Sequence, residues 1–532
     1  MEASNKKYRS HYIKNLLLPC LCFSVVTGII SAILISLFKC ASDVAVGISE
    51  NIYASVRTSY LQLPVLLAFA ALIGFVASLI LTFSHSCKGG GIPTSIAAIR
   101  GIIGFKWLKS AFLLPLSALL SFLCGMPLGT EGPCVQMGTA IGNGAVKLFG
   151  GKKHRGWTRY MMTGGASAGF ALATGAPITA IIFAMEEVHR RFSPLLFLVS
   201  ALSVAVSQLT THALSAIGLH SHKLFYLDHI EPFPHSYFIA PIVIGILCGV
   251  CSIFFTRFYN FIDKHIRSKL GRLSVMVKFP IIFAIIAVIG VFCAYSLGSG
   301  HSLIEHLFER EFTFYVIIIF FVLRAVMMMI SNTAGVTGGI FLPTLAFGAM
   351  IGALTAEGFI AFNDIFADYY EFFVILGMAS FLGASSKIPV TACVFAIEVL
   401  GGTGNIHAVI IAVTTAFLTL EASGLDDFTD TVIKMKAKAI HKGKEAHTIE
   451  VPLTVREGSF VIDKELRDIL WPASCVFLSI EKGPNRTDKL GVATGDILTV
   501  RYKTYDPVAT AEEFEILVGD QSKETDKIMR PQ

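Results

Sequence analysis

Long apolar runs separated by short polar segments fill most of the chain. Examples lie at 16–37, 61–83, 238–255, 279–289, 314–330 and 406–420. Several approach the ~20 residues that a helix needs to cross the hydrocarbon core of a bilayer. Others are shorter and are broken by glycine or proline. Because backbone polar groups in hydrocarbon must bond within the chain, the pattern predicts an all-α polytopic membrane protein.

The pattern changes near residue 433. After a basic stretch at 434–444 the apolar runs become short, and a soluble, mixed composition follows. Alternation of β-branched and apolar residues predicts strands at 449–455, 475–481 and 495–502. An amphipathic helix is expected between the first two strands, at 461–470. We therefore predict a small α/β cytoplasmic domain over 447–520, followed by a tail at 521–532.

Composition is consistent with lipid as the surrounding medium. Hydrophobic residues make up 54% of the chain and charged residues 15%, whereas charged residues make up about 25% of an average soluble protein. The net charge is +6, but no basic face is evident, so we expect no nucleic-acid partner. Most of the eleven cysteines lie in apolar runs, which favours neither a disulfide framework nor a zinc site. We expect no metal and no cofactor.

Basic residues at the chain start bear on topology. Residues 1–15 are polar and basic, and no small-residue cleavage site follows the first apolar run, so we expect a cytoplasmic N-terminus and no signal peptide. Loop 264–278 is basic and should also be cytoplasmic. Loop 147–159 is basic as well, so charge alone leaves the full topology open. We expect a multi-pass protein of the cell inner (plasma) membrane with both termini cytoplasmic.

Two pairs of segments indicate an internal repeat. Segment 176–187 resembles 388–399 at an offset of 212, and segment 133–142 resembles 343–352 at an offset of 210. Repeated halves with interrupted helices are typical of transporters. Sequence does not decide whether the halves are inverted or parallel. We predict a membrane domain over 16–440, with repeat halves at about 16–212 and 236–421 and a final pore helix at 428–440.

Glycine-rich breaks at 89–93, 129–133 and 338–343 each precede an apolar helical run and carry a proline in or near the first turn. Each therefore marks a helix N-terminus, whose unpaired N–H groups and partial positive charge favour an anion. The alternative is that glycines only allow close helix packing, as Gly138 and Gly142 would.

The breaks resemble the GSGIP, G(K/R)EGP and GxFxP signatures of the CLC chloride channels and transporters. The Pro-x-Thr-Ala-x-x-Phe-Ala-x-Glu-Glu stretch after them resembles that family's next helix, and the match spans about 15–440. The resemblance implies a homodimer with one pore per subunit and two inverted halves of tilted, partial helices. It also implies an anion bound where helix N-termini converge, at Gly90, Gly91, Ile92, Glu131, Gly132, Ile340, Phe341 and Phe428.

Two glutamates receive roles from the resemblance. Glu131 would be the external gating glutamate, whose carboxylate competes with chloride; the alternative is a helix-capping carboxylate. Glu187 would be the internal glutamate that passes protons to the cytoplasm; the alternative is a surface salt bridge with neighbouring arginines. Glu186 and Glu398 are related by the repeat, and we expect them to bond backbone or polar neighbours.

Two positions depart from the family pattern. The family's central serine is Gly90 here, and its central tyrosine aligns with Phe428. Loss of a hydroxyl–anion hydrogen bond costs on the order of 1–3 kcal/mol unless water replaces it. We therefore expect weaker anion binding at the central site, and altered selectivity or looser coupling.

The 450–518 segment resembles the TrkA-C module of potassium-conductance regulators. Such modules dimerise and bind small ligands, cyclic dinucleotides among them; the alternative is a plain stability or dimerisation domain. No TVGYG or HExxH motif is present, which argues against a potassium channel subunit and against an enzyme. The leading interpretation is a chloride/proton antiporter in membrane lipid, and the alternative is a passive chloride channel with a widened inner gate.

Overall fold

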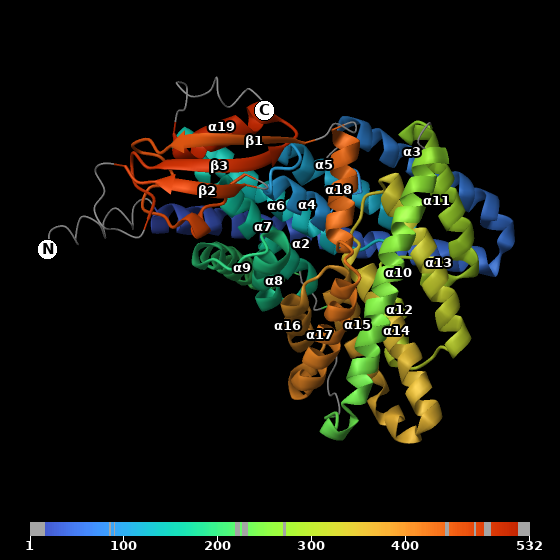
Figure 1. Cartoon of the computed structure of the whole chain (residues 1–532). Helices are drawn as coiled ribbons and strands as arrows, with labels where there is room; N and C mark the ends of the chain where they lie inside the picture. The colour runs from blue at the N-terminus through green and yellow to red at the C-terminus, as the bar shows by residue number, and fades with distance from the viewer. Residues whose placement is uncertain are drawn as a thin grey trace.

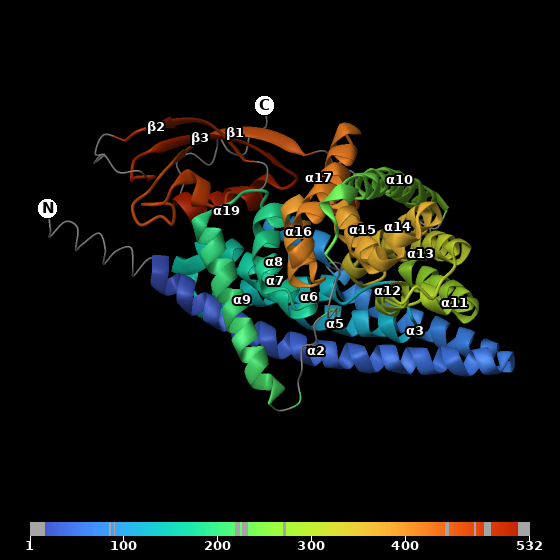
Figure 2. The same ribbon diagram turned by 90° about the horizontal axis from the view of Figure 1, so that it is seen from below.

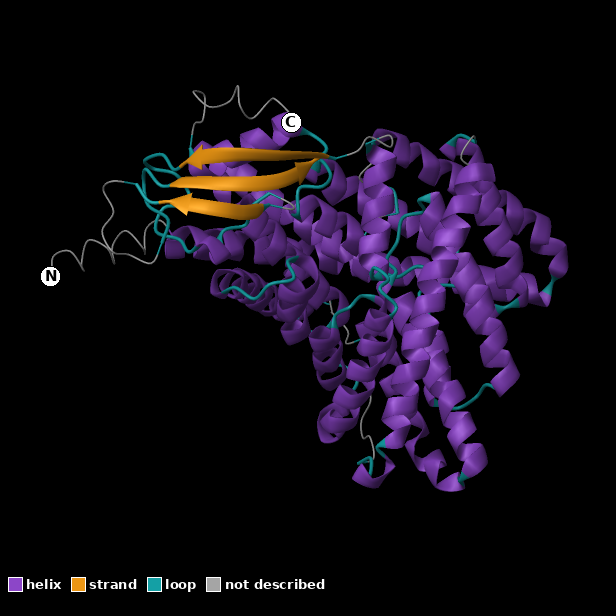
Figure 3. Cartoon of the chain, viewed as in Figure 1, coloured by secondary structure: helices purple, strands orange, loops and turns teal. Residues whose placement is uncertain are grey.

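The computed structural model contains a helical membrane region with a small sheet domain against one edge (Figures 1 and 3). It describes residues 16–84, 87–89, 91–216, 218, 224–225, 232–269, 273–441, 446–472, 475–483 and 491–519. Each apolar run predicted from the sequence forms a helix. Among the described residues, eight helical segments are long and apolar enough to cross a membrane.

The first half of the membrane region begins with a very long helix. Its helices are α2 (Leu18–Thr58), α3 (Leu63–Phe83), α4 (Ile92–Ile99), α5 (Trp107–Leu123), α6 (Glu131–Phe149), α7 (Thr158–Thr174), α8 (Pro177–Phe183) and α9 (Pro194–Ser215). Helix α2 runs along one side of the molecule, and α5, α6, α7 and α9 pack on it (Figure 2). A π-helical turn, Ala184–Val188, extends α8 and carries Glu186 and Glu187.

The second half repeats this pattern of long and partial helices. Its helices are α10 (Ile239–Lys269), α11 (Val275–Phe292), α12 (His301–Phe308), α13 (Phe314–Ala334), α14 (Phe341–Phe362), α15 (Tyr370–Ser385), α16 (Pro389–Glu398), α17 (Ile406–Ala422) and α18 (Phe428–Ile440). Helices α8 and α16, which carry the repeated Pro-x-Thr-Ala motif, both begin at their proline. Proline is tolerated there because the first N–H of a helix has no intrahelical acceptor.

Reciprocal hydrogen bonds between α8 and α16 establish how the two halves are related. The N–H and hydroxyl of Thr391, at the start of α16, both donate to Glu186 over 2.6 Å. The N–H and hydroxyl of Thr179, at the start of α8, both donate to Glu398 over 2.7 Å. Each helix therefore ends beside the other's beginning, so the equivalent helices are antiparallel and the halves are inverted. The expectation that these glutamates bond backbone and polar neighbours is confirmed.

Glycines inside the helices do serve close packing. A Cβ on Gly138 of α6 would lie 1.9 Å from the carbonyl oxygen of Gly165 in α7. In the second half, a Cβ on Gly348 of α14 would lie 2.5 Å from the carbonyl oxygen of Gly377 in α15. The same backbone contact thus joins α6 to α7 and α14 to α15, as small residues allow in membrane helices.

The sheet domain consists of β1 (His447–Thr454), β2 (Val476–Glu481) and β3 (Ile497–Thr504), followed by α19 (Pro507–Val518). The strand order is β1-β3-β2, with both pairs antiparallel. Alternate residues of β1 and β3 are buried, among them Val451 and Val500, which are directly paired. The three strands predicted from the sequence are confirmed.

The helix predicted at 461–470 is wrong. Only a 3₁₀ turn, Leu466–Asp468, forms there. Asp463 has a φ of +61°, which a right-handed helix cannot include. Its N–H donates to the carbonyl of Val492 over 3.0 Å instead. The backbone of this segment therefore bonds to a neighbouring segment, and its apolar side chains fill the core of the sheet domain without helical periodicity.

The sheet domain lies against the membrane region (Figure 2), and an aromatic cluster joins the two parts. The ring of Phe460 lies 5.6 Å from that of Trp157 and 5.9 Å from that of Tyr160. The Tyr160 hydroxyl donates to the carbonyl of Asp468, and it accepts from the N–H of Leu470 over 3.1 Å. Apolar contacts and buried hydrogen bonds thus hold the two parts together.

Candidate anion pathway

The three glycine-rich breaks meet at one place. Gly129 and Gly339 exchange two backbone hydrogen bonds of 2.8 and 2.7 Å, which pairs the breaks before α6 and α14. A Cβ on Gly132 would lie 2.7 Å from the Cα of Gly339 and 2.9 Å from the Cα of Gly91. Only glycine fits at such a backbone contact, so the sequence motif sets the convergence of the three loops.

Helix N-termini follow directly from this convergence. Helix α4 begins at Ile92, α6 at Glu131 and α14 at Phe341, with Ile340 as its N-cap. The first N–H groups of a helix have no intrahelical acceptor and carry partial positive charge. The amides expected to bind the anion therefore belong to helix starts that lie side by side in the core.

Glu131 is buried at this point. Its side chain is 1% exposed, and among the described residues one carboxylate oxygen, Oε2, has no hydrogen-bond partner. The ammonium group of Lys39 in α2 donates to the carbonyl of Leu172 over 3.0 Å, at the C-terminal end of α7. A buried carboxyl group with an unused oxygen, among helix N-termini, occupies the position that suits a small anion.

Two predicted anion ligands, Gly91 and Gly90, differ from the amides of the helix starts. The N–H of Gly91 donates to Oε1 of Gln136 over 2.8 Å, so this amide is already used within the protein. Gly90 lies outside the described residues. The remaining backbone donors at the convergence are those of the three helix starts.

Aromatic rings close around Phe341. Its ring meets Phe170 of α7 edge-on at 5.0 Å and Phe395 of α16 at 5.6 Å. Phe170 stacks on Phe183 of α8 at 4.7 Å. Phe183 and Phe395 are repeat-related, so both halves supply the apolar wall beside the helix starts. Such a wall keeps water away and strengthens electrostatic interactions nearby.

Phe428 begins α18, and the residue after it contacts Glu187. Phe428, the first residue of α18, is buried with its ring 4.8 Å from Tyr259 and 5.2 Å from Phe255. The next residue, Thr429, donates its hydroxyl to Oε1 of Glu187 over 2.8 Å. The Glu187 side chain is 4% exposed, so it is no surface ion pair.

The neighbouring arginines have other partners. Arg190 pairs with Asp427 and Asp430 at the start of α18. Arg100 donates to the backbone carbonyls of Glu187 and Val188 over 2.8 and 2.9 Å. The turn that carries the Glu187 carboxyl group is therefore fixed through its backbone. Its carboxylate accepts from a neutral hydroxyl.

Lys436 was not singled out from the sequence. Its ammonium group donates to the carbonyl of Gly89 over 2.7 Å and to the hydroxyl of Thr94 over 2.5 Å. These contacts place the amine of Lys436 against the first glycine-rich break. In the sequence, Lys436 is one of three alternating lysines of a polar helix end, and nothing there distinguishes it from its exposed neighbour Lys434.

Comparison with known proteins agrees with this arrangement. A family model described as voltage gated chloride channel matches residues 70–421. A slow cyanobacterial Cl⁻/H⁺ antiporter is similar in structure, with TM-score 0.71, 22% identity, and coverage of 79% of this chain and 98% of that chain. A eukaryotic CLC transporter has TM-score 0.65 and 18% identity, with coverage of 79% and 74% respectively. A CLC-type fluoride/proton antiporter has TM-score 0.61 and 20% identity, with coverage of 76% and 95%.

At these identities the solved structures establish a shared fold, whereas the family model rests on the sequence itself. Its match extends over more than half of the chain and includes all three glycine-rich breaks. Helix α18 lies beyond the end of the match. The inverted halves and the converging helix starts are what that fold requires. The chain therefore belongs to the voltage-gated chloride channel (CLC) family.

Proposed function

We propose that this protein exchanges chloride for protons across the membrane. The observation that carries the proposal is the pair of buried carboxyl groups, Glu131 at the helix starts and Glu187 bonded to Thr429 at the start of α18. An acidic residue buried in a membrane domain is a functional candidate because its charge is costly there. Two such groups on one anion pathway are suited to moving protons as well as anions.

In this mechanism the Glu131 carboxylate and chloride compete for the same helix starts. When ionised, the carboxylate is itself an anion and fills the site. Protonation removes its charge, so the helix starts then favour chloride instead. Glu187 supplies or accepts that proton on the cytoplasmic side, held by the hydroxyl of Thr429. Binding that depends on helix ends is weak enough for the anion to leave again.

Liposomes loaded with chloride test the proposal. External chloride and pH are recorded together, and chloride efflux is expected to drive proton uptake against a gradient. Glu187→Gln should abolish proton movement while chloride still flows. Glu421→Gln, which alters an exposed ion pair with Lys387, is the matched control and should keep both fluxes. Chloride efflux without proton movement in the unaltered protein would contradict exchange.

A passive chloride channel is the second candidate, and Phe428 is the observation that favours it. Its ring offers no hydroxyl to an anion, so the inner side of the site binds less firmly than a tyrosine would allow. Phe428→Tyr distinguishes the candidates. If the unaltered protein leaks chloride without protons and Phe428→Tyr slows that leak, the channel interpretation holds.

The proposal includes a homodimer in the plasma membrane with both termini cytoplasmic. Cys20 and Phe23, at the start of α2, pack in one cluster with Leu470 of the sheet domain. The beginning of the membrane region and the sheet domain therefore share a side, and the basic residues before α2 favour the cytoplasm for that side. Chemical cross-linking in native membranes tests the dimer, and protease access to the sheet domain in inside-out vesicles tests the orientation.

A further inference from the structure

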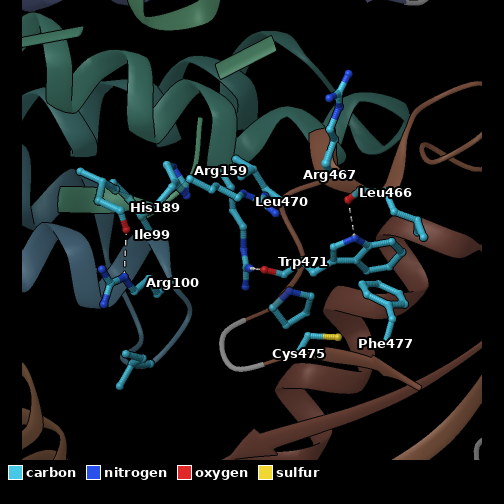
Figure 4. A pocket seen from close by; sticks show the side chains of 14 residues that line it. Ile99, Arg100, Arg159, His189, Leu466, Arg467, Leu470, Trp471, Cys475 and Phe477 are labelled. Atoms are coloured by element: carbon cyan, nitrogen blue, oxygen red, sulfur yellow. Dashed lines mark hydrogen bonds between the residues drawn. The ribbon is translucent and has the colours of Figure 1, made fainter. Parts of the chain in front are cut away.

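A cavity of about 550 Å³ lies between the sheet domain and the membrane region (Figure 4). Its membrane side is formed by the end of α4, the start of α7 and the turn after α8. Its other side is formed by the segment around the 3₁₀ turn and the start of β2. The side chains that decide its chemistry are Arg100, Arg159, Arg191, Arg467, Trp471 and Phe477.

The arginines keep hydrogen-bonding capacity. Arg191 donates to the carbonyl of Ile469 over 2.8 Å. Arg159 donates to the carbonyl of Trp471 and to Glu513. A guanidinium group has five N–H donors, so among the described residues these bonds leave several of them unused. Among the described residues, no carboxylate lines the cavity. Arg100, Arg159 and Arg467 pair with carboxylates outside the lining, namely Asp430, Glu513 and Glu465, whereas Arg191 bonds to a backbone carbonyl.

Positive charge is crowded at this wall. Burial, and then Arg191, Arg100 and Arg159, hold the pKa of His189 well below its usual value. His189 also lines the cavity, and its Nε2 lies 2.7 Å from the hydroxyl of Thr163. The three guanidinium groups add to the effect of burial in opposing a further positive charge at this wall, and they favour an incoming anion.

The opposite wall carries two aromatic side chains. The rings of Trp471 and Phe477 meet at 4.9 Å in an edge-to-face arrangement, beside the guanidinium groups (Figure 4). Arginine binds phosphate with two parallel hydrogen bonds, and an aromatic wall accepts a planar ring. The volume falls within the ~300–1,000 Å³ of small-molecule sites.

We propose that this cavity binds a small organic phosphate with a planar ring, of the size of a nucleoside diphosphate. The phosphates lie on the arginines and the ring lies against Trp471 and Phe477. A phospholipid headgroup offers the same phosphate without the ring.

The site lies next to the transport machinery. Arg100 and Val188 line the cavity, and Arg100 holds the carbonyl of Glu187. A ligand that accepts a hydrogen bond from Arg100 therefore competes with the backbone of the turn that carries Glu187. This regulatory effect rests on the proposed transport function, whereas binding itself does not.

Isothermal titration of the full-length protein with ADP tests binding, with no flux measurement involved. Arg467→Gln removes an exposed arginine of the cavity, which pairs with Glu465, and should weaken ADP binding about tenfold. Arg501→Gln removes an exposed arginine that pairs with Glu450 on the sheet, away from the cavity. It is the matched control and should bind ADP as the unaltered protein does.

Two further probes separate the sources of the phosphate. Pyrophosphate should bind more weakly than ADP, because it cannot use the aromatic wall; equal binding would overturn the assignment of a planar ring. ADP binding in nanodiscs of neutral lipid that disappears in nanodiscs of phosphatidylglycerol would assign the cavity to a lipid headgroup and overturn a soluble ligand. An absence of ADP binding at millimolar concentration, or equal weakening by both arginine variants, would overturn the site itself. Loss of proton coupling with intact ADP binding would count only against the proposed transport function.

Discussion

The hydroxyl of Thr429 lies 2.8 Å from the carboxylate of Glu187, one residue beyond Phe428 in α18. The first turn of α18 thus carries both the aromatic ring proposed for the anion pathway and a hydroxyl bonded to the candidate proton carrier. Any movement of this turn affects both groups, because they are adjacent in the chain. Coupling between anion and proton can therefore be tested on α18 without altering either glutamate.

Thr429→Val removes the hydroxyl and keeps the side-chain shape. A hydrogen bond to a charged group contributes about 1.5–3 kcal/mol, so we expect proton flux to fall about tenfold while chloride flux persists. Thr431→Val, on the same helix and also buried, is the control. Paired chloride and pH recordings from liposomes measure the ratio; an equal fall in both fluxes would show that Thr429 serves only the fold.

Lys436→Gln removes the amine that donates to Gly89 and Thr94. A protonated amine against the first break attracts an anion, so chloride binding measured by isothermal titration at acidic pH should weaken about tenfold. Lys436→Arg keeps the charge and should retain most of the affinity. Lys434→Gln, on the same helix but paired with Asp426 at the surface, should change little, and an equal loss in both glutamine variants would argue for a general surface charge effect.

Gly132→Ala places a methyl group against the backbone of two other breaks. Because backbone cannot move aside as a side chain does, we expect a loss of about 1–3 kcal/mol in stability. The melting temperature in detergent should fall. Gly358→Ala, where a Cβ meets nothing within 4 Å, should leave it unchanged or raise it, since alanine favours helix more than glycine does.

Glu398→Ala removes the cap at the start of α8 and leaves buried donors unpaired. The expected cost is about 1–3 kcal/mol, read from the melting temperature in detergent. Glu186→Ala removes the equivalent cap at the start of α16 and should cost a similar amount. Glu357→Ala, which breaks an exposed pair with Arg310, should cost about 1 kcal/mol or less. Markedly different losses for the two caps would contradict their equivalence.

Hydropathy predicted the helices and alternation predicted the strands, because both patterns arise from burial of one face or of a whole segment. The two caps were predicted as polar contacts from the repeat. Helix α19 was not predicted, although Asp506 caps it over 3.1 Å and Pro507 opens it. Those are ordinary start signals, and the helix is short and mixed in composition.

Other features depend on contacts that no local pattern contains. The inverted relation of the halves follows from which helix end meets which, and matching residues alone are equally compatible with parallel halves. The 461–470 segment has helical amphipathicity, but its backbone bonds to Val492 and Tyr160 outweigh that preference. Lys436 is distinguished from its neighbours only by its contact with Gly89, which lies 347 positions earlier in the chain.

The reciprocal caps of α8 and α16 have a consequence for biosynthesis. The start of α8 leaves the ribosome long before its partner exists, because Glu398 follows Ile178 by 220 positions. Until then α8 sits in the bilayer with its first amides unsatisfied, which favours a loosely inserted or interfacial state over final seating. The core of the first half is therefore completed only when the second half arrives. Released nascent chains that stop short of α16 should therefore stay protease-sensitive at α8 however long they are incubated, because the missing group is Glu398 of the second half.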